Sequence, residues 1–316
     1  MALFILKRVG VMLLTVLCLT FVVFSLTNLE PNLVKLAKEQ NNMRMTDAQV
    51  ESWLEREGYR EPLLSRYGSW VAGMAVGDWG DSTRFREPVR DIVSKRLYYT
   101  GKLMLWVLIV MVPMALIVGI LAGMREGTVM DRSLSTFAIT TTATPEYVSG
   151  VIFTVIFASS AVGLKWMKGV ATSATDGITF ENFALPVMTI ALYGMGYIAR
   201  MTRASMAEVM TAQYIRTARL KGVSFPGIVL RHALRNALIA PFTVIMLQFP
   251  FLLTGVVIVE SLFNYKGFGW TLVEAASNND IELLLGCSIV AVIVVLVTQL
   301  ISDIGYVFLN PRIRIQ

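Results

Sequence analysis

The sequence predicts an all-α integral membrane protein with six transmembrane helices and both termini in the cytoplasm. Two observations support this prediction: the abundance of apolar residues, and the one-sided distribution of positive charge between long apolar runs. Hydrophobic residues make up 55% of the 316 positions and charged residues only 16%, whereas soluble domains carry about 25% charged residues. The composition therefore indicates a chain that folds in lipid, and membrane lipid is its first expected partner.

Six apolar runs are long enough to cross a bilayer, which requires about 20 mostly apolar residues. Five of the runs contain no charged residue, and the sixth is interrupted only by Pro145 and Glu146. The uninterrupted runs are residues 9–29, 103–124, 183–199, 236–259 and 283–302, and the interrupted run is 133–164.

The first run follows Lys7 and Arg8, a pattern that cleavable signal peptides share. The run is longer than the apolar region of a usual signal peptide, and SLTNLEP after it offers no small-x-small cleavage site. We therefore expect this segment to remain in the protein as its first span.

Positive charge is concentrated in segments that an even number of crossings places on one side of the membrane. Residues 200–235 carry seven basic residues against a single acid, Glu208. Residues 30–97 have equal numbers of acids and bases, and residues 260–282 are acidic. Because cytoplasmic loops hold the excess of Lys and Arg, residues 200–235 and both termini are predicted to be cytoplasmic.

This topology divides the chain into parts. Within the external part, Thr46 is suited to begin a short helix and GDWGDS at 77–82 to form a turn. The predicted parts are a cytoplasmic N-terminus and first helix at 1–29, an external cap at 30–97, a transmembrane core at 98–309 that includes a cytoplasmic loop at 200–240, and a cytoplasmic tail at 310–316.

Catalysis, cofactor binding and metal binding find no support in the residues. No lysine is followed by Ser or Thr, so the sequence has no P-loop. His232 is the single histidine, and Cys18 and Cys287 lie in apolar runs, where they are expected to act as small hydrophobes. We predict no catalytic residue, no cofactor, no metal and no nucleic-acid partner. A membrane enzyme is disfavoured because no nucleophile or carboxylate pair is clustered.

The basic loop contains YIRTARLKG, which has features that an orientation signal does not need. Tyr214, Ile215 and Ala218 fall on one face of a predicted helix, and Arg216 and Arg219 fall on another. A short amphipathic helix with a cationic edge suits a protein groove better than a lipid surface, which would favour bulkier apolar residues and more lysine.

The loop is predicted to break between two helices. ASMAEVMTAQYIRTARLKG forms the first and FPGIVLRHALRNAL the second. Gly222 stands where a helix C-terminus requires a left-handed residue, and Pro226 suits the first turn of the next helix.

These residues resemble the EAA loop of bacterial ABC-importer permeases, in which a helix–Gly–helix segment fits a cleft on the ATPase subunit. Arg216, Thr217 and Ala218 stand at the three named positions, and Gly222 follows after a gap of three residues. RHALRNAL at 231–238 makes the sequence more similar to the peptide/nickel branch of that family. GVVIVESLFNYKGFGWTLVEAASNND and LNPRIR resemble the same branch, and GDWGDS its first, longer-looped permease subunit.

The resemblance implies a type I ABC-importer permease in the bacterial inner membrane. Its expected cargo is a di- or oligopeptide, with nickel chelates, opines and oligosaccharides as alternatives. The implied partners are a second homologous permease that forms a heterodimer, two cytoplasmic ABC ATPases that hold ATP and Mg²⁺, and an extracytoplasmic substrate-binding protein. The residues it assigns to ATPase coupling are Tyr214, Ile215, Arg216, Thr217, Ala218, Arg219, Lys221 and Gly222.

Polar residues within the predicted spans are candidates for the translocation path. Glu146 is expected near the middle of the bilayer, where it either meets a substrate ammonium or lies at an interface with a neighbouring subunit. Gln248 and Thr254 in the fifth span either line the path or make interhelical hydrogen bonds. Glu260, at the outer end of that span, is either a contact for the binding protein or a solvated helix end.

A stand-alone channel or ion-coupled transporter is the alternative from another functional class. Such a protein would carry ionisable residues or broken helices at repeated positions in its two halves. Only Glu146 meets this criterion.

Overall fold

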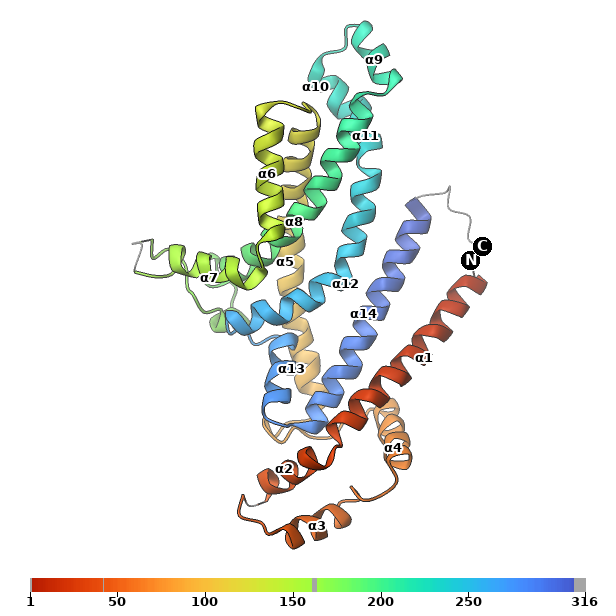
Figure 1. The fold of residues 1–316 in the computed structure, drawn as a ribbon, viewed down its shortest axis with the longest axis vertical. Helices are drawn as coiled ribbons and strands as arrows, with labels where there is room; N and C mark the ends of the chain where they lie inside the picture. The colour runs from red at the N-terminus through yellow and green to blue at the C-terminus, as the bar shows by residue number, and fades with distance from the viewer. Residues whose placement is uncertain (1, 42, 161–163, 310–316) are drawn as a thin grey trace. The chain divides into compact units, whose positions relative to one another are not determined.

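The computed structural model describes residues 2–41, 43–160 and 164–309, without the side chains of residues 2–5, 249–255 and 306–309. Most of the described chain is helical, and it contains no strand (Figure 1). The predicted tail at 310–316 lies outside the described residues. The chain divides into a cap unit, Met1–Tyr99 with Lys266–Val297, and a core unit, Thr100–Tyr265 with Thr298–Gln316.

The cap unit contains five complete helices and parts of two longer ones. The complete helices are α1 (Ala2–Thr27), α2 (Glu30–Gln40), α3 (Asp47–Arg56), α4 (Leu63–Val76) and α13 (Phe268–Ser277). The two longer helices, α5 (Val89–Gly123) and α14 (Ile281–Leu309), contribute residues to both units.

One cluster of buried side chains joins α2 and α3 to α1 and α14, and α4 packs against it. It includes Phe24, Leu36, Leu54 and Leu285. Burial of such a cluster is favourable by roughly 1.5–3 kcal/mol for each large apolar side chain. It explains why a segment with balanced charge folds at all, because its few apolar residues converge on one place.

Local signals in the cap unit agree with the sequence predictions. Thr46 and Gln49 form a capping box at the start of α3, with Gln49 Oε1 accepting a hydrogen bond from the Thr46 backbone N–H at 2.9 Å. Gly77 and Gly80 have positive φ, which confirms the turn in GDWGDS. Arg60 donates a hydrogen bond to Glu30 at 2.7 Å, which holds the pKa of that carboxyl below its usual range.

The core unit is built around α8 (Phe180–Met210), whose apolar part is mostly buried. Helices α6 (Val129–Ala143), α7 (Glu146–Phe157) and α12 (Ile239–Leu262) pack against it (Figure 1). A short 3₁₀ helix, η1 (Thr172–Thr175), precedes α8. The contact between α6 and α8 is close at Gly196, where a Cβ atom would lie only 2.3 Å from the carbonyl oxygen of Ala138.

Four helices are long and apolar enough to span a membrane: Leu6–Thr27, Val89–Gly123, Phe180–Met210 and Ile281–Gly305. They correspond to four of the predicted runs. A fifth span is formed if Phe225–Ala237 and Ile239–Gln248, which meet at a 50° bend, are taken together. The predicted fifth run began at residue 236, whereas α12 begins at Ile239.

The interrupted run at 133–164 is two helices and not one, so the expected long helix was wrong. α6 ends at Ala143, and α7 begins at Glu146. Thr144 adopts extended dihedrals (φ −88°, ψ 122°), because the ring of the following Pro145 disfavours the helical conformation of the residue before it. Glu146 is therefore the first residue of a helix, and does not lie halfway along one.

The segment after α8, which the sequence predicted to be a cytoplasmic loop, and the bend that follows it contain several short helical pieces. They are α9 (Gln213–Leu220), α10 (Phe225–Gly227), the π-helix η2 (Ile228–Ala233) and α11 (Leu234–Ala237). Pro226 lies in the first turn of α10, as predicted.

Candidate functional site

Helix α9 carries most of the residues predicted to couple to an ATPase, and it is separate from α8. The sequence predicted one helix through residues 204–222, which was wrong. Thr211 and Ala212 interrupt it, and Ala212 is extended (φ −64°, ψ 149°). The hydroxyl of Thr211 donates a hydrogen bond to the carbonyl oxygen of Glu208 at 2.7 Å, which completes the last turn of α8. This break allows α9 to point in its own direction (Figure 1).

The end of α9 is a Schellman motif built on Gly222. Gly222 has a φ of +75°, which confirms the predicted left-handed conformation. Its N–H donates to the carbonyl oxygen of Arg219 at 3.0 Å, and the N–H of Val223 donates to that of Ala218 at 3.2 Å. A Cβ at Gly222 would meet nothing within 4 Å, so the backbone conformation, and not space, restricts this position.

One face of α9 packs on its own chain. Ile215 is fully buried, and Ala218 is 7% exposed. Both belong to a cluster with Met206 of α8 and with Ile228 and Ala233 of η2. The sequence grouped these two residues correctly on one face, but that face holds the helix to the core unit and is not free to meet another subunit.

Tyr214 lies at the edge of this packed face. Its side chain is 43% exposed, and its hydroxyl accepts a hydrogen bond from Asn236 Nδ2 at 2.9 Å. Ser205 of α8 donates a hydrogen bond to the carbonyl oxygen of Ala237 at 2.8 Å. Both bonds tie residues 236–237, at the end of α11, to the segment formed by α8 and α9.

The other face of α9 is exposed and combines charge with one large apolar side chain. Arg216, Thr217, Arg219 and Lys221 are all exposed. Leu220 is 82% exposed among them. Leu220 was not among the predicted coupling residues, although its position off the Ile215–Ala218 face and beside two cations was a usable signal. A rigid helix with an apolar side chain ringed by cations is suited to a groove on a protein partner.

An ion pair between α6 and α8 was also not among the features predicted from sequence. Asp131 is 2% exposed and accepts two hydrogen bonds from Arg203, at 2.5 Å to Nε and 2.8 Å to Nη2. Gly127 N–H and Ser135 Oγ also donate to this carboxylate. The start of α6 and the last part of α8 are thereby held together, so that α8 is a stiff support for α9.

Glu146 is buried at the start of α7. Its residue is 8% exposed, and no hydrogen bond or ion pair joins its carboxylate to any residue that the structure describes. One turn further on, Gly150 allows close packing, since a Cβ there would lie 2.4 Å from Leu262 Cδ2 of α12. No fully buried side-chain oxygen of the described residues lacks a hydrogen-bond partner, so the Glu146 carboxylate reaches the surface of the described chain and is accessible to a group outside it.

The remaining membrane candidates have different outcomes. Gln248 is half-buried on α12. The side chain of Thr254 lies outside the described part of the structure.

Glu260 is fully buried, and Thr100 Oγ1 donates a hydrogen bond to it. The prediction that Glu260 is an exposed contact or a solvated end was therefore wrong. Phe263 and Tyr265 are also fully buried just beyond it, so the end of α12 is enclosed.

Comparison with known proteins identifies the family. Residues 115–315 match the family described as binding-protein-dependent transport system inner membrane component. The chain belongs to this family. It is a permease of the peptide/nickel branch of ABC transporters, as the resemblance of RTARLKG and RHALRNAL predicted.

Several relatives of this permease match over most of their length. A putative peptide permease protein of Brucella suis biovar 1 (strain 1330) is 30% identical over 305 residues, 95% of each chain. The oligopeptide transport system permease protein AppB of Bacillus subtilis (strain 168) is 30% identical, over 86% of this chain and 87% of its own. The glutathione transport system permease protein GsiC of Escherichia coli (strain K12) is 32% identical over 85% of each chain.

Membership has direct consequences. The permease is a multi-pass protein of the bacterial inner membrane and serves as a membrane component of an ABC importer. The components of its family are not themselves catalytic. Transport in this family depends on a binding protein, as the family description states.

Proposed function

We propose that this permease forms half of the translocation pathway of an ATP-driven importer of di- or oligopeptides. The relatives named for peptides, oligopeptides and glutathione support this cargo. The observation that carries the proposal is helix α9: a short helix fixed to the core unit through Ile215, with Leu220 and the cations Arg216, Arg219 and Lys221 exposed on the other side.

Two cytoplasmic ATPases, which bind ATP and Mg²⁺, are the proposed motor. One of them receives the exposed face of α9, while Tyr214, Ile215 and Ala218 hold the helix from its other side. When the ATPases close, α9 moves as a rigid body and carries α8 and residues 225–237 with it. A second, homologous permease completes the pathway as a heterodimer, and a binding protein delivers the peptide from outside.

The proposed topology has six crossings, with both termini in the cytoplasm. The four long helices and the bent pair supply five of them. α6 has 15 residues and α7 has 12, which correspond to roughly 22 and 18 Å at 1.5 Å per residue. Each is shorter than the bilayer core of about 30 Å. We therefore assign the sixth crossing to the two helices together, with the break at Pro145 inside the membrane.

Glu146 is the proposed contact for the positively charged end of the peptide. It is buried, lies at a helix break and has no partner among the described residues. Broken helices in transporters mark substrate sites, since their ends carry unpaired backbone groups and line cavities. Gln248 and Thr254 remain proposed wall residues further along the path.

Co-purification from native membranes tests the proposal. When the permease is purified through an affinity tag, P-loop ATPases are expected to co-purify with it. The expected ratio is two ATPase subunits for each pair of permease subunits. A transporter of the channel or ion-coupled class would be isolated without them. Absence of ATPases from a preparation that still contains the second permease would overturn the proposed coupling role.

A further inference from the structure

A turn in the cap unit presents two arginines on a rigid base. The base is Asp280, which is fully buried. Its Oδ2 accepts hydrogen bonds from Ser82 Oγ at 2.5 Å and from the backbone N–H of Arg84 at 3.1 Å. Its Oδ1 accepts one from the N–H of Leu283 at 3.3 Å, in the first turn of α14. One carboxylate therefore both caps a long helix and fixes the turn.

Arg86 completes this turn in an unusual conformation. Its φ is +57°, in the left-handed region that Gly or Asn adopts more easily. Its N–H donates to the carbonyl oxygen of Ser82 at 2.9 Å, so the conformation is part of the turn. Non-glycine residues in such strained backbone conformations cluster at functional sites, where the side chain contacts a ligand or a partner. No hydrogen bond or ion pair joins the guanidinium of Arg86 to any described residue.

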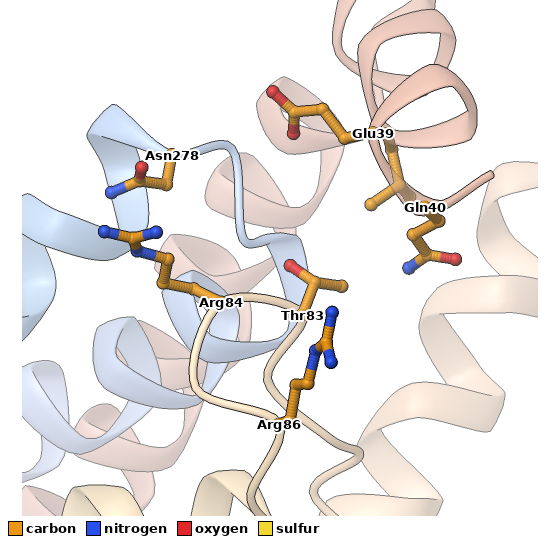
Figure 2. A pocket seen from close by; sticks show the side chains of 7 residues that line it. Glu39, Gln40, Thr83, Arg84, Arg86 and Asn278 are labelled. Atoms are coloured by element: carbon orange, nitrogen blue, oxygen red, sulfur yellow. The ribbon is translucent and has the colours of Figure 1, made fainter. Parts of the chain in front are cut away.

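The turn forms one wall of an open pocket of about 460 Å³. Figure 2 shows Thr83, Arg84 and Arg86 on the turn, with Asn278 on one side and Glu39 and Gln40 of α2 on the other. Leu36 completes the lining.

The charge of this pocket is positive. Arg84 makes one ion pair at 3.5 Å with Glu274 and remains 56% exposed. Glu39 is the only acid in the lining, and Lys35 lies 3.7 Å from its carboxylate. Two guanidinium groups, one hydroxyl, two amides and the single carboxylate of Glu39 are therefore presented to the pocket. Guanidinium groups bind carboxylates in a planar, two-pronged geometry, so a carboxylate is the chemical group that this pocket fits.

We infer that this pocket receives an acidic side chain of the substrate-binding protein when that protein docks on the permease. The inference rests on the proposed function, in which a binding protein delivers the peptide. A protein side chain fits better than a free peptide, because the pocket is open and its wall is polar except for Leu36. Small-molecule sites are mostly apolar and enclosed. The anchored turn holds Arg86 in place before docking, which lowers the entropic cost of the contact.

The test uses the complete transporter in lipid nanodiscs, together with the binding protein encoded by its own organism. Two quantities are measured: the association rate of the binding protein at low and high salt, and the stimulation of ATP hydrolysis. Arg86→Glu is expected to slow association roughly tenfold and to weaken its salt dependence, since charges at an interface rim act mainly on association. Basal ATP hydrolysis is expected to stay unchanged.

Two further variants complete the test, one as a matched control and one that removes the side chain alone. Arg90→Glu makes the same charge change at an exposed site at the start of α5, outside the pocket lining, and is expected to behave as the wild type. Arg86→Gly removes the side chain and suits the backbone conformation, so it separates loss of the contact from misfolding. It is expected to slow association without affecting the amount of folded transporter.

A charge exchange identifies the partner residue. A cysteine at Thr83 is crosslinked to the docked binding protein, and the acidic residue nearest the crosslink is changed to Arg. This change is expected to restore the association of Arg86→Glu. Equal association rates for Arg86→Glu and Arg90→Glu would overturn the inference. So would a selective loss of direct peptide binding, which would mean that the pocket takes the substrate. If the binding protein fails to stimulate the wild type, the proposed function itself is overturned.

Discussion

At the level of single residues, Gly222 ends α9 with a φ of +75° and sets the direction of the chain that follows. A β-branched side chain in the left-handed region is disfavoured by roughly 1–2 kcal/mol or more. If the turn opened, the hydrogen bond from the Val223 N–H to the carbonyl oxygen of Ala218 would be lost.

Gly222→Val is therefore expected to abolish ATP-driven uptake while the protein still inserts into the membrane. Uptake of labelled peptide and the amount of protein in the membrane are measured side by side. Gly222→Asn is the matched control, because Asn tolerates the left-handed conformation, and it is expected to retain most of the uptake. Normal uptake by the Val variant would contradict the coupling role of this loop.

Glu146 leads to a second prediction at this scale. If its carboxylate binds the peptide ammonium, Glu146→Gln is expected to reduce uptake of peptides with a free N-terminus roughly tenfold. Loss of one charge-assisted hydrogen bond weakens binding by about 1.4 kcal/mol, and that energy corresponds to a tenfold change in affinity. Uptake of the same peptides with an acetylated N-terminus is expected to change little. An equal loss for both kinds of peptide would remove the ammonium from the explanation and leave a structural role for Glu146.

At the level of elements, one face of α9 packs against its own chain, and the opposite face is exposed and available to a partner. Ile215 and Ala218 pack against α8 and η2, while Leu220 points away from that cluster and is 82% exposed. An isolated helix of eight residues would be unstable in water. The packed face and the Schellman motif therefore supply the stability that allows the exposed face to remain ordered.

Leu220→Asp is expected to weaken binding of the ATPase subunit. Loss of a central apolar contact at an interface costs about 2 kcal/mol or more, which corresponds to roughly a thirtyfold change in Kd. Leu230→Asp provides the control, since Leu230 is also exposed (66%) but lies in η2 and not on α9. A pull-down titration with purified ATPase measures both. Stronger loss from Leu230→Asp would mean that the ATPase contacts η2 instead.

At the level of the whole molecule, the break at Pro145 affects the topology more than any other departure from prediction. If α6 and α7 together make one crossing, the residues before and after them are on opposite sides of the membrane. If α6 and α7 together enter the membrane and return to the same side, the number of crossings is odd, and the termini are on opposite sides.

Cysteine labelling distinguishes these topologies. In a background with Cys18 and Cys287 replaced by Ala, Glu39→Cys is expected to react with a membrane-impermeant maleimide in intact cells, because residues 30–97 are predicted to be external. Leu220→Cys is expected to react only after permeabilisation, and Lys168→Cys, beyond α7, is expected to react in intact cells. Protection of Lys168→Cys until permeabilisation would contradict a crossing by α6 and α7.

Features that depend on neighbours in the chain were predictable from sequence. The abundance of apolar residues and the asymmetry of charge indicated a membrane protein of several spans. Thr46 before the helix of residues 47–56, and Gly222 after Lys221, specified helix ends, since capping involves residues within one turn. RTARLKG, together with RHALRNAL and the segments at 255–280 and 309–314, indicated the family.

Only the tertiary structure decided which side chains are free. Asp131 and Arg203, 72 positions apart, pair in the core unit, and Asp280 anchors Ser82 across 198 positions. Sequence periodicity grouped Ile215 with Ala218 but did not say that their own chain covers them, and it left Glu260 exposed where the structure buries it. A helical pattern specifies which residues share a face, whereas what covers that face depends on segments distant in the chain.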